Sequence, residues 1–188
     1  MAELRLVKPS AAELPGYTAA LQRGWSPDPV RLEKAAAEEL ARIVADPAGF
    51  LASLDDPEAR GAPIKLPDGS TVPRLPGYRR WMWDGELVGS IGFRWQKGTS
   101  TLPAHVLGHI GYAVVPWKRK LGHAKRALAL LLPEAKARGL DYVELTTDPD
   151  NVASQKVIQS CGGRLIERFN EGPAYGNAEG FRYRIDLR

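Results

Sequence analysis

A short basic turn near the middle of the chain combines residue types that bind phosphate. The apolar run 109–115 ends at Pro116 and is followed by Arg119-x-x-Gly122-x-Ala124 and then by a helix-like sequence. A helix that starts at such a turn leaves its first backbone N–H groups without intrahelical acceptors. Together with the positive end of the helix dipole, these donors attract a pyrophosphate. The pattern therefore predicts a site for a cofactor that carries phosphate groups.

Basic residues gather around this turn, although the chain as a whole carries a modest net charge of +4. A basic cluster can bind nucleic acid, but cations around a single turn suit one small polyanion better. Two other phosphate-binding motifs are excluded, because the sequence has no Walker loop and this turn has a single glycine, where a dinucleotide fingerprint needs three. The clustered cations are Lys118, Arg119, Lys120, Lys125 and Arg126.

Apolar periodicity predicts a series of strands with helices between them. Asp84-Gly85 joins two strand-like runs, which is a two-residue hairpin signal. Pro133 predicts a kink or an early stop in the helix after the basic turn, and 46–77 is expected to form mainly turns and loops. Strands are predicted at about 3–7, 78–83, 86–95, 106–115, 141–147, 164–169 and 181–187, and helices within 11–25, behind Ser26-Pro27-Asp28-Pro29, and over 124–139 and 152–161. This order favours one α/β domain over 1–188, with helices on both faces of a mixed sheet.

Two motifs together resemble the GNAT superfamily of N-acetyltransferases. Arg119, Gly122 and Ala124 match that family's Arg/Gln-x-x-Gly-x-Gly/Ala turn, and Asn151 and Ser154 match its Asn-x-x-Ser-x-x-Val segment. The resemblance covers about 78–187, is weak over 1–77, and is closest to a bacterial branch with a poorly defined substrate. It implies a mixed, mostly antiparallel sheet flanked by helices, with 78–188 as the core that binds acetyl-coenzyme A and 1–77 shaping the acceptor pocket.

The same resemblance implies which residues contact acetyl-coenzyme A, the expected co-substrate. The amides of 120–125 would hold the pyrophosphate, and the backbone of the preceding strand would pair with the pantetheine arm where that strand splays from the next. One of those strand N–H groups would also stabilise the oxyanion of the tetrahedral intermediate. The implied contacts are Tyr112, Ala113, Val114, Arg119, Lys120, Leu121, Gly122, His123, Ala124, Lys125, Asn151 and Ser154. Asn151 could instead cap a helix.

Three residues are candidates for the acid–base groups of the predicted reaction. Many relatives carry a Glu five residues before the Asn and a Tyr seven residues after it, whereas this chain has Thr146 and Ile158 there. Glu144, two residues before Thr146 on the same strand face, is a candidate base, with an ion-pair partner as its alternative. His109 is a second candidate base, because imidazole titrates near neutrality. Ser154 is a candidate proton donor to the departing sulfur.

The predicted activity is acetyl transfer from acetyl-coenzyme A to a primary amine of a small molecule or a protein N-terminus, by direct attack in a ternary complex. A non-catalytic acyl-coenzyme A sensor is the alternative. No metal is expected, because His105 and His109 lie on or near a strand with no Cys or clustered acid nearby. The single Cys161 and the lack of an apolar run of about 20 residues predict a cytoplasmic protein that does not bind a membrane. We also expect no nucleic-acid partner, and a monomer or homodimer.

Overall fold

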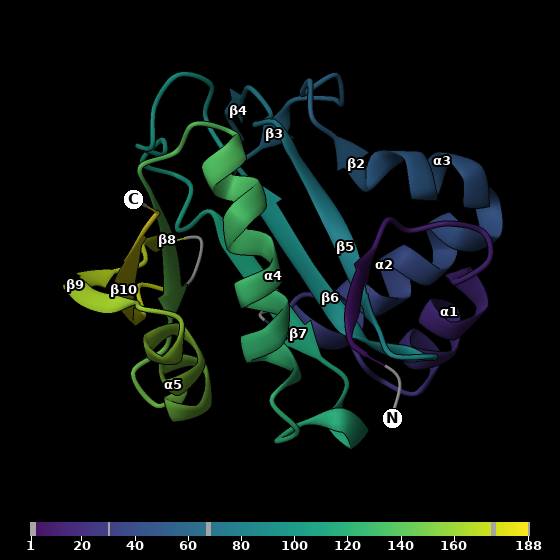
Figure 1. Ribbon diagram of the computed structural model, residues 1–188. Helices are drawn as coiled ribbons and strands as arrows, with labels where there is room; N and C mark the ends of the chain where they lie inside the picture. Colours follow the sequence, from purple (N-terminus) through teal and green to yellow (C-terminus); the bar gives the residue numbers. More distant parts are fainter. Residues whose placement is uncertain (1–2, 30, 67–68, 174–175, 188) are drawn as a thin grey trace. The chain divides into compact units, whose positions relative to one another are not determined.

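The computed structural model describes residues 3–29, 31–66, 69–173 and 176–187 (Figure 1). Its helices are α1 (Leu14–Gln22), α2 (Leu32–Ala45), α3 (Pro47–Ser53), the 3-10 helix η1 (Pro116–Lys118), α4 (His123–Ala137) and α5 (Val152–Ser160). Its strands are β1 (Arg5–Val7), β2 (Asp55–Asp56), β3 (Ile64–Lys65), β4 (Thr71–Val72), β5 (Gly77–Trp83), β6 (Leu87–Arg94), β7 (Ile110–Val114), β8 (Tyr142–Thr147), β9 (Arg164–Asn170) and β10 (Glu179–Asp186).

The strands form two larger sheets and a small hairpin, so the predicted mixed α/β fold is confirmed. One sheet has the order β1-β5-β6-β7, with β2 also paired to β5. The other has the order β8-β10-β9, and β3 pairs with β4 alone. The registers determined for β1–β5, β2–β5, β3–β4, β8–β10 and β9–β10 are all antiparallel.

By its internal contacts the chain divides into two compact units, each built from segments far apart in sequence. The first unit comprises Met1–Pro57, Gly77–Gly92 and Tyr112–Ala127. The second comprises Glu58–Pro76, Phe93–Gly111 and Leu128–Arg188. The basic turn therefore belongs to the first unit, and the motif that starts at Asn151 belongs to the second.

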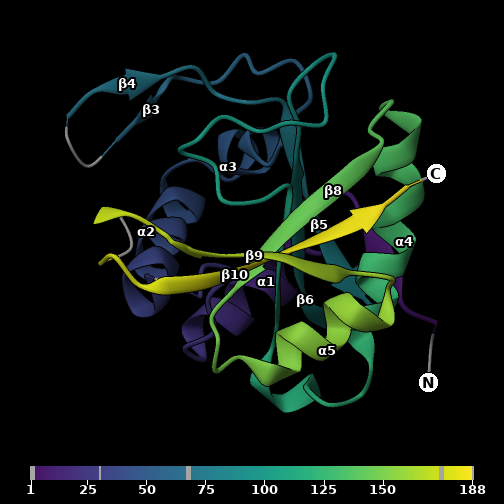
Figure 2. The same cartoon turned by 90° about the vertical axis from the view of Figure 1, so that its left-hand side faces the viewer.

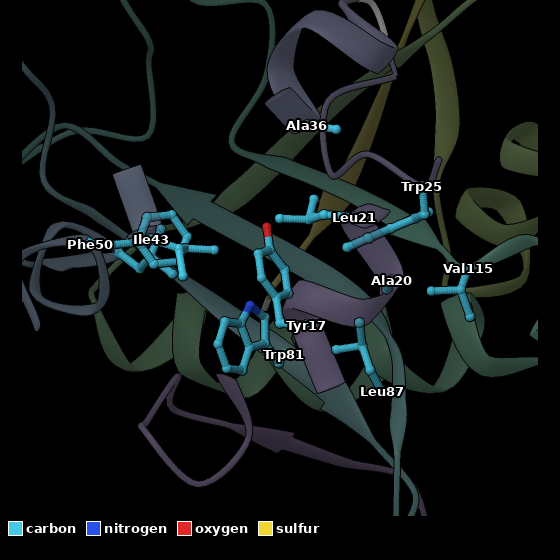
Figure 3. Packing of buried hydrophobic residues seen from close by; sticks show 11 residues of the cluster. Tyr17, Ala20, Leu21, Trp25, Ala36, Ile43, Phe50, Trp81, Leu87 and Val115 are labelled. Atoms are coloured by element: carbon cyan, nitrogen blue, oxygen red, sulfur yellow. The ribbon is translucent and has the colours of Figure 1, made fainter. Parts of the chain in front are cut away.

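An aromatic cluster forms the core of the first unit (Figure 3). The Tyr17 ring of α1 stacks on the Trp81 ring of β5, with centroids 4.5 Å apart, and Trp25 meets Tyr17 edge-on at 5.6 Å. Such large rings bury much apolar area and fix their relative orientation. This cluster therefore holds the helices that precede residue 46 on the strand that leads into the β5–β6 hairpin.

The second unit is built around the β8-β10-β9 sheet, with α5 packed against β8 (Figure 2). Tyr183 and Ile185 of β10 are buried, as their alternation predicts, and so is Leu187, which follows the strand. The intervening Arg182 and Arg184 are only half-buried, and both contact Glu144. The polar side of β10 is thus an ion-pair network.

Four local predictions differ from the structure. Helix α2 begins at Leu32 rather than directly behind the predicted Ser26 cap, because the Asp28 side chain accepts a hydrogen bond from the Arg31 N–H, so this turn precedes the helix. The segment 46–77 contains α3, whose first turn is capped by Asp46. The strand predicted at 106–115 is shorter, since β7 begins at Ile110. Helix α4 continues past Pro133 to Ala137, so of the two outcomes predicted for this proline the early stop is wrong.

Candidate cofactor-binding turn and acid–base residues

The turn between η1 and α4 is exposed and adopts an unusual backbone conformation. Lys120 has φ +63° and Gly122 has φ +79°, so two of its residues are left-handed. Glycine suits this region, whereas a lysine there is strained and must be held by its surroundings. The Arg126 N–H donates to the Gly122 carbonyl at 3.1 Å, so the helical hydrogen bonds start at Gly122. The amides of His123 and Ala124 precede that first bond, where a helix favours an anion.

Two of the cations around the turn contact other groups of the protein. Lys118 donates to Asp84 at 2.6 Å and to Glu86 at 2.8 Å, and its side chain is 12% exposed. Arg119 Nε donates to the Val114 carbonyl at 3.2 Å. Lys118 is therefore an internal ion-pair partner, so the sequence-based grouping of five cations overstates the charge available to a phosphate.

Strand β7 is an edge strand of its sheet, and its backbone N–H and C=O groups point alternately toward β6 and toward the outer edge. The Val115 N–H donates to the Val88 carbonyl at 2.9 Å, and the Arg94 N–H donates to the His109 carbonyl at 2.9 Å. Because successive residues of a strand face opposite ways, the backbone groups of Ala113 point toward β6 with those of Val115. Those of Tyr112 and Val114 point to the other edge.

Gly89 on β6 explains how closely these two strands approach. A Cβ atom at this position would lie 2.2 Å from the Ala113 carbonyl oxygen. Only glycine permits such an approach, so the position of β7 depends on the missing side chain.

His109, one candidate base, is enclosed in the second unit. Its exposed fraction is 0%. The imidazole Nδ1 accepts a hydrogen bond from the backbone N–H of Glu144 at 2.9 Å, and the backbone N–H of His109 donates to the Glu144 carbonyl at 2.7 Å. Nε2 is buried and makes no hydrogen bond within the described chain. Burial lowers the pKa of His109 to about 4, although the Glu144 carboxylate opposes the shift. This imidazole is neutral near pH 7. Through it, the residue that precedes β7 is hydrogen-bonded to β8.

Glu144, the other candidate base, is the centre of an ion-pair network on the same unit. One carboxylate oxygen accepts from Arg184 at 2.7 Å, the other accepts from Arg182 at 3.3 Å, and the residue is only 8% exposed. Arg182 also donates to Glu167 at 2.9 Å and to the Leu107 carbonyl at 3.2 Å. A carboxylate held by two guanidinium groups is poorly placed to take a proton from an incoming amine.

The downstream motif starts α5. The Asn151 side chain accepts from the Ser154 N–H at 3.1 Å and so caps this helix. Gln155 Nε2 donates to the Pro149 carbonyl at 2.8 Å, which fixes the loop ahead of the helix. Ser154 therefore lies in the first turn of a well-anchored helix.

The structure brings together residues that the sequence did not connect. In the first unit, Asp84 lies beside Lys118 and 3.9 Å from His123 Nε2. Also there, Tyr17 donates to Glu39 at 2.5 Å, and Arg79 donates to the same carboxylate at 2.7 Å. Burial raises the pKa of Tyr17, so its hydroxyl stays protonated. The only sequence signal for the first cluster was the turn-forming Asp84-Gly85.

Two findings bear on other classes of site. Across the described ranges, no three His, Cys, Asp or Glu side chains are arranged to hold a metal ion. None of the helices in those ranges combines the length and apolar character needed to cross a membrane.

A family model described as the acetyltransferase (GNAT) family matches residues 56–162, which is more than half of the chain. The match contains β5 to β8, the basic turn and α5. No curated protein matches the sequence.

Several solved acetyltransferases are similar in structure at low sequence identity. The microcin C7 self-immunity acetyltransferase MccE, in complex with acetyl-CoA and AMP, has a TM-score of 0.64 at 12% identity, covering 98% of this chain and 92% of its own. A GNAT-family acetyltransferase from Bacillus anthracis has a TM-score of 0.59 at 17% identity, covering 100% and 97%. RimL, the ribosomal L7/L12 alpha-N-protein acetyltransferase, has a TM-score of 0.58 at 12% identity, covering 98% and 93%. At these identities the likeness shows a shared fold.

Proposed function

Since the chain belongs to the acetyltransferase (GNAT) family, we propose that it transfers an acetyl group from acetyl-coenzyme A to a primary amine. The observation that carries this proposal is the turn 119–122, exposed at the start of α4 and containing two left-handed residues. A turn of this kind directs backbone N–H groups outward at the positive end of a helix dipole. A pyrophosphate is the ligand that matches it.

The cofactor would be bound mainly by backbone groups. The amides of residues 120–125 would hold the pyrophosphate, and Arg119, Lys120 and Lys125 would add charge-assisted contacts to its oxygens. The outward edge of β7, at Tyr112 and Val114, would pair with the amides of the pantetheine arm, since an edge strand can accept an extended chain. Ala113 would hold this edge in place through its backbone groups, which point toward β6. Leu121 would form part of the exposed surface of the turn.

The reaction consists of one addition and one elimination. The neutral amine attacks the thioester carbonyl, so that a C–N bond forms and the carbonyl oxygen becomes an oxyanion. An N–H of the β7 edge would donate to this oxyanion, a type of contact worth roughly 3 kcal/mol in other enzymes. The C–S bond then breaks and coenzyme A leaves as a thiolate. We assign the protonation of this thiolate to the Ser154 hydroxyl on α5, which regains a proton from water, while the attacking nitrogen gives its extra proton to water as the amide forms.

The substrate ammonium must lose a proton before attack, because an alkyl amine has a pKa near 10. The enclosure of His109 and the two arginines on Glu144 argue against both as bases. We therefore propose that the proton leaves through water. In this proposal His109 and Glu144 support the strands, and Asn151 positions Ser154 by capping α5.

The acceptor is proposed to be a small molecule or a protein N-terminus. Both classes are compatible with the fold, since RimL is named for α-N-protein acetylation and MccE was crystallised with AMP. The segment 1–77, which includes α1 and α2, would shape the acceptor pocket.

The test is release of coenzyme A thiol from acetyl-coenzyme A in the presence of a panel of primary amines, with peptides of free N-terminus included. Amine-dependent thiol release with acetylated product, seen by mass spectrometry, would support the proposal. Tight acetyl-coenzyme A binding without turnover of any amine would favour an acyl-coenzyme A sensor. Absence of binding would refute both readings.

A further inference from the structure

One carboxylate touches both ends of the basic turn. Asp84 lies in the three-residue loop between β5 and β6, and one of its oxygens accepts from Lys118 Nζ at 2.6 Å. Its other oxygen lies 3.9 Å from His123 Nε2. Lys118 ends η1 and His123 begins α4, so the same side chain reaches the residues on either side of 119–122.

All three side chains are shielded from solvent. The exposed fractions are 10% for the Asp84 side chain, 12% for Lys118 and 6% for His123. Burial disfavours the charged form of Asp84, but the hydrogen bond and charge of Lys118 outweigh it, so the pKa of Asp84 lies below its usual value. Charges so enclosed are screened far less than surface charges. The contact is thus a firm link between the hairpin and the turn.

The turn needs such a link because its backbone is not in a relaxed conformation. Lys120 holds a left-handed φ of +63° without being glycine, and Gly122 follows at +79°. A strained segment persists only when its surroundings fix it. Asp84 hydrogen-bonds Lys118 at one end of this segment and lies beside the buried His123 at the other.

We infer that Asp84 is a positioning residue for the cofactor turn: it holds residues 118–123 in the conformation that presents the amides from residue 120 onward to the pyrophosphate. The inference rests on the proposed function. It is also unexpected on charge alone, because an acidic group beside a phosphate site repels the ligand. Electrostatics by itself predicts that Asp84→Asn binds acetyl-coenzyme A more tightly, whereas positioning predicts weaker binding.

The experiment compares Asp84→Asn with Glu86→Gln. Glu86 is the matched control, because it also contacts Lys118 but is 71% exposed, and Asp84 is the acid that lies beside His123. We expect the dissociation constant of acetyl-coenzyme A, measured by calorimetry, to rise about tenfold for Asp84→Asn, since a factor of ten is a modest loss of preorganisation. Glu86→Gln should stay within about twofold of wild type. KM for acetyl-coenzyme A should rise likewise, with kcat at saturation unchanged.

One further readout and one further variant separate positioning from general instability. In the free protein, the amide NMR shifts of 119–123 should change for Asp84→Asn and not for Glu86→Gln. Should Asp84→Asn fail to fold, Asp84→Glu replaces it: the longer side chain cannot keep both contacts, so binding should weaken several-fold.

Wild-type binding by a folded Asp84 variant, or tighter binding, would overturn the inference alone. If the wild-type chain does not bind acetyl-coenzyme A, the proposed function fails and the inference falls with it.

Discussion

Replacing Gly122 with glutamate should abolish most acetyl-coenzyme A binding while leaving the protein folded. A Cβ at Gly122 meets nothing within 4 Å, so the new side chain has room. The positive φ of +79° makes any non-glycine residue strained there, at a cost of about 1 kcal/mol in the free energy of unfolding. That loss is small beside the stability of a typical domain, about 5–15 kcal/mol.

The effect on binding comes from charge. At a separation of about 5 Å and an effective dielectric constant of about 20, two like unit charges repel by about 3 kcal/mol. That energy corresponds to a rise in the dissociation constant of roughly 100-fold. Gly122→Gln is the matched control, because it has the same shape and the same backbone strain but no charge.

The assay is a calorimetric titration of both variants with acetyl-coenzyme A at two ionic strengths. The Glu variant should bind about 100-fold more weakly than the Gln variant at low salt, and the gap should narrow in about 1 M salt, where the Debye length falls to about 3 Å. Equal affinities for Glu and Gln would refute the assignment of the phosphate site to this turn.

Three other changes test the support of the site. Glu144→Gln removes the carboxylate that Arg182 and Arg184 share, and leaves Arg182 with Glu167 alone. It should lower the free energy of unfolding by about 2–3 kcal/mol in urea titrations, with the pH–rate profile unmoved; a shifted acid limb in a stable variant would instead make Glu144 the base. His109 has a folded-state pKa of about 4, below its unfolded value, so its stabilising effect is complete above about pH 6.5 and is lost as the pH falls to about 4. Over that window the free energy of unfolding of wild type should therefore fall by about 3 kcal/mol more than that of His109→Gln. Parallel plots of unfolding free energy against pH for the two proteins would contradict a buried, neutral His109. Gly89→Ala should lower the free energy of unfolding by roughly 3 kcal/mol, because its Cβ would lie 2.2 Å from the Ala113 carbonyl oxygen. An unchanged Tm would show that β6 and β7 do not approach so closely.

Local patterns in the sequence were enough to predict most of the elements and the position of the basic turn ahead of α4. Asp84-Gly85 identified the hairpin and the alternation of Tyr183 and Ile185 identified β10, because hairpin propensity and strand burial depend on neighbouring residues. Helix α3 also had a local signal that went unused, since Asp46-Pro47 is an N-cap followed by proline at the first helical position.

Contacts that depend on strand register could not be predicted. Glu144 meets Arg184 because β8 and β10 pair with Arg184 directly opposite Glu144, and no spacing within either strand reveals that alignment. Lys118 likewise counts in the sequence as one of the clustered cations, because its partner Asp84 is distant along the chain. His109 is an example of the same limit: its residue type suggested acid–base chemistry, whereas its burial and its Nδ1 contact depend on tertiary structure.

The most direct test of the account is an amide NMR titration of the isotopically labelled protein with acetyl-coenzyme A. If backbone donors of the turn hold the pyrophosphate, the largest shifts should fall on residues 120–125, with a second group on β7 at 112–114. Saturating ligand that leaves those amides unmoved, or that shifts a different surface, would contradict the account.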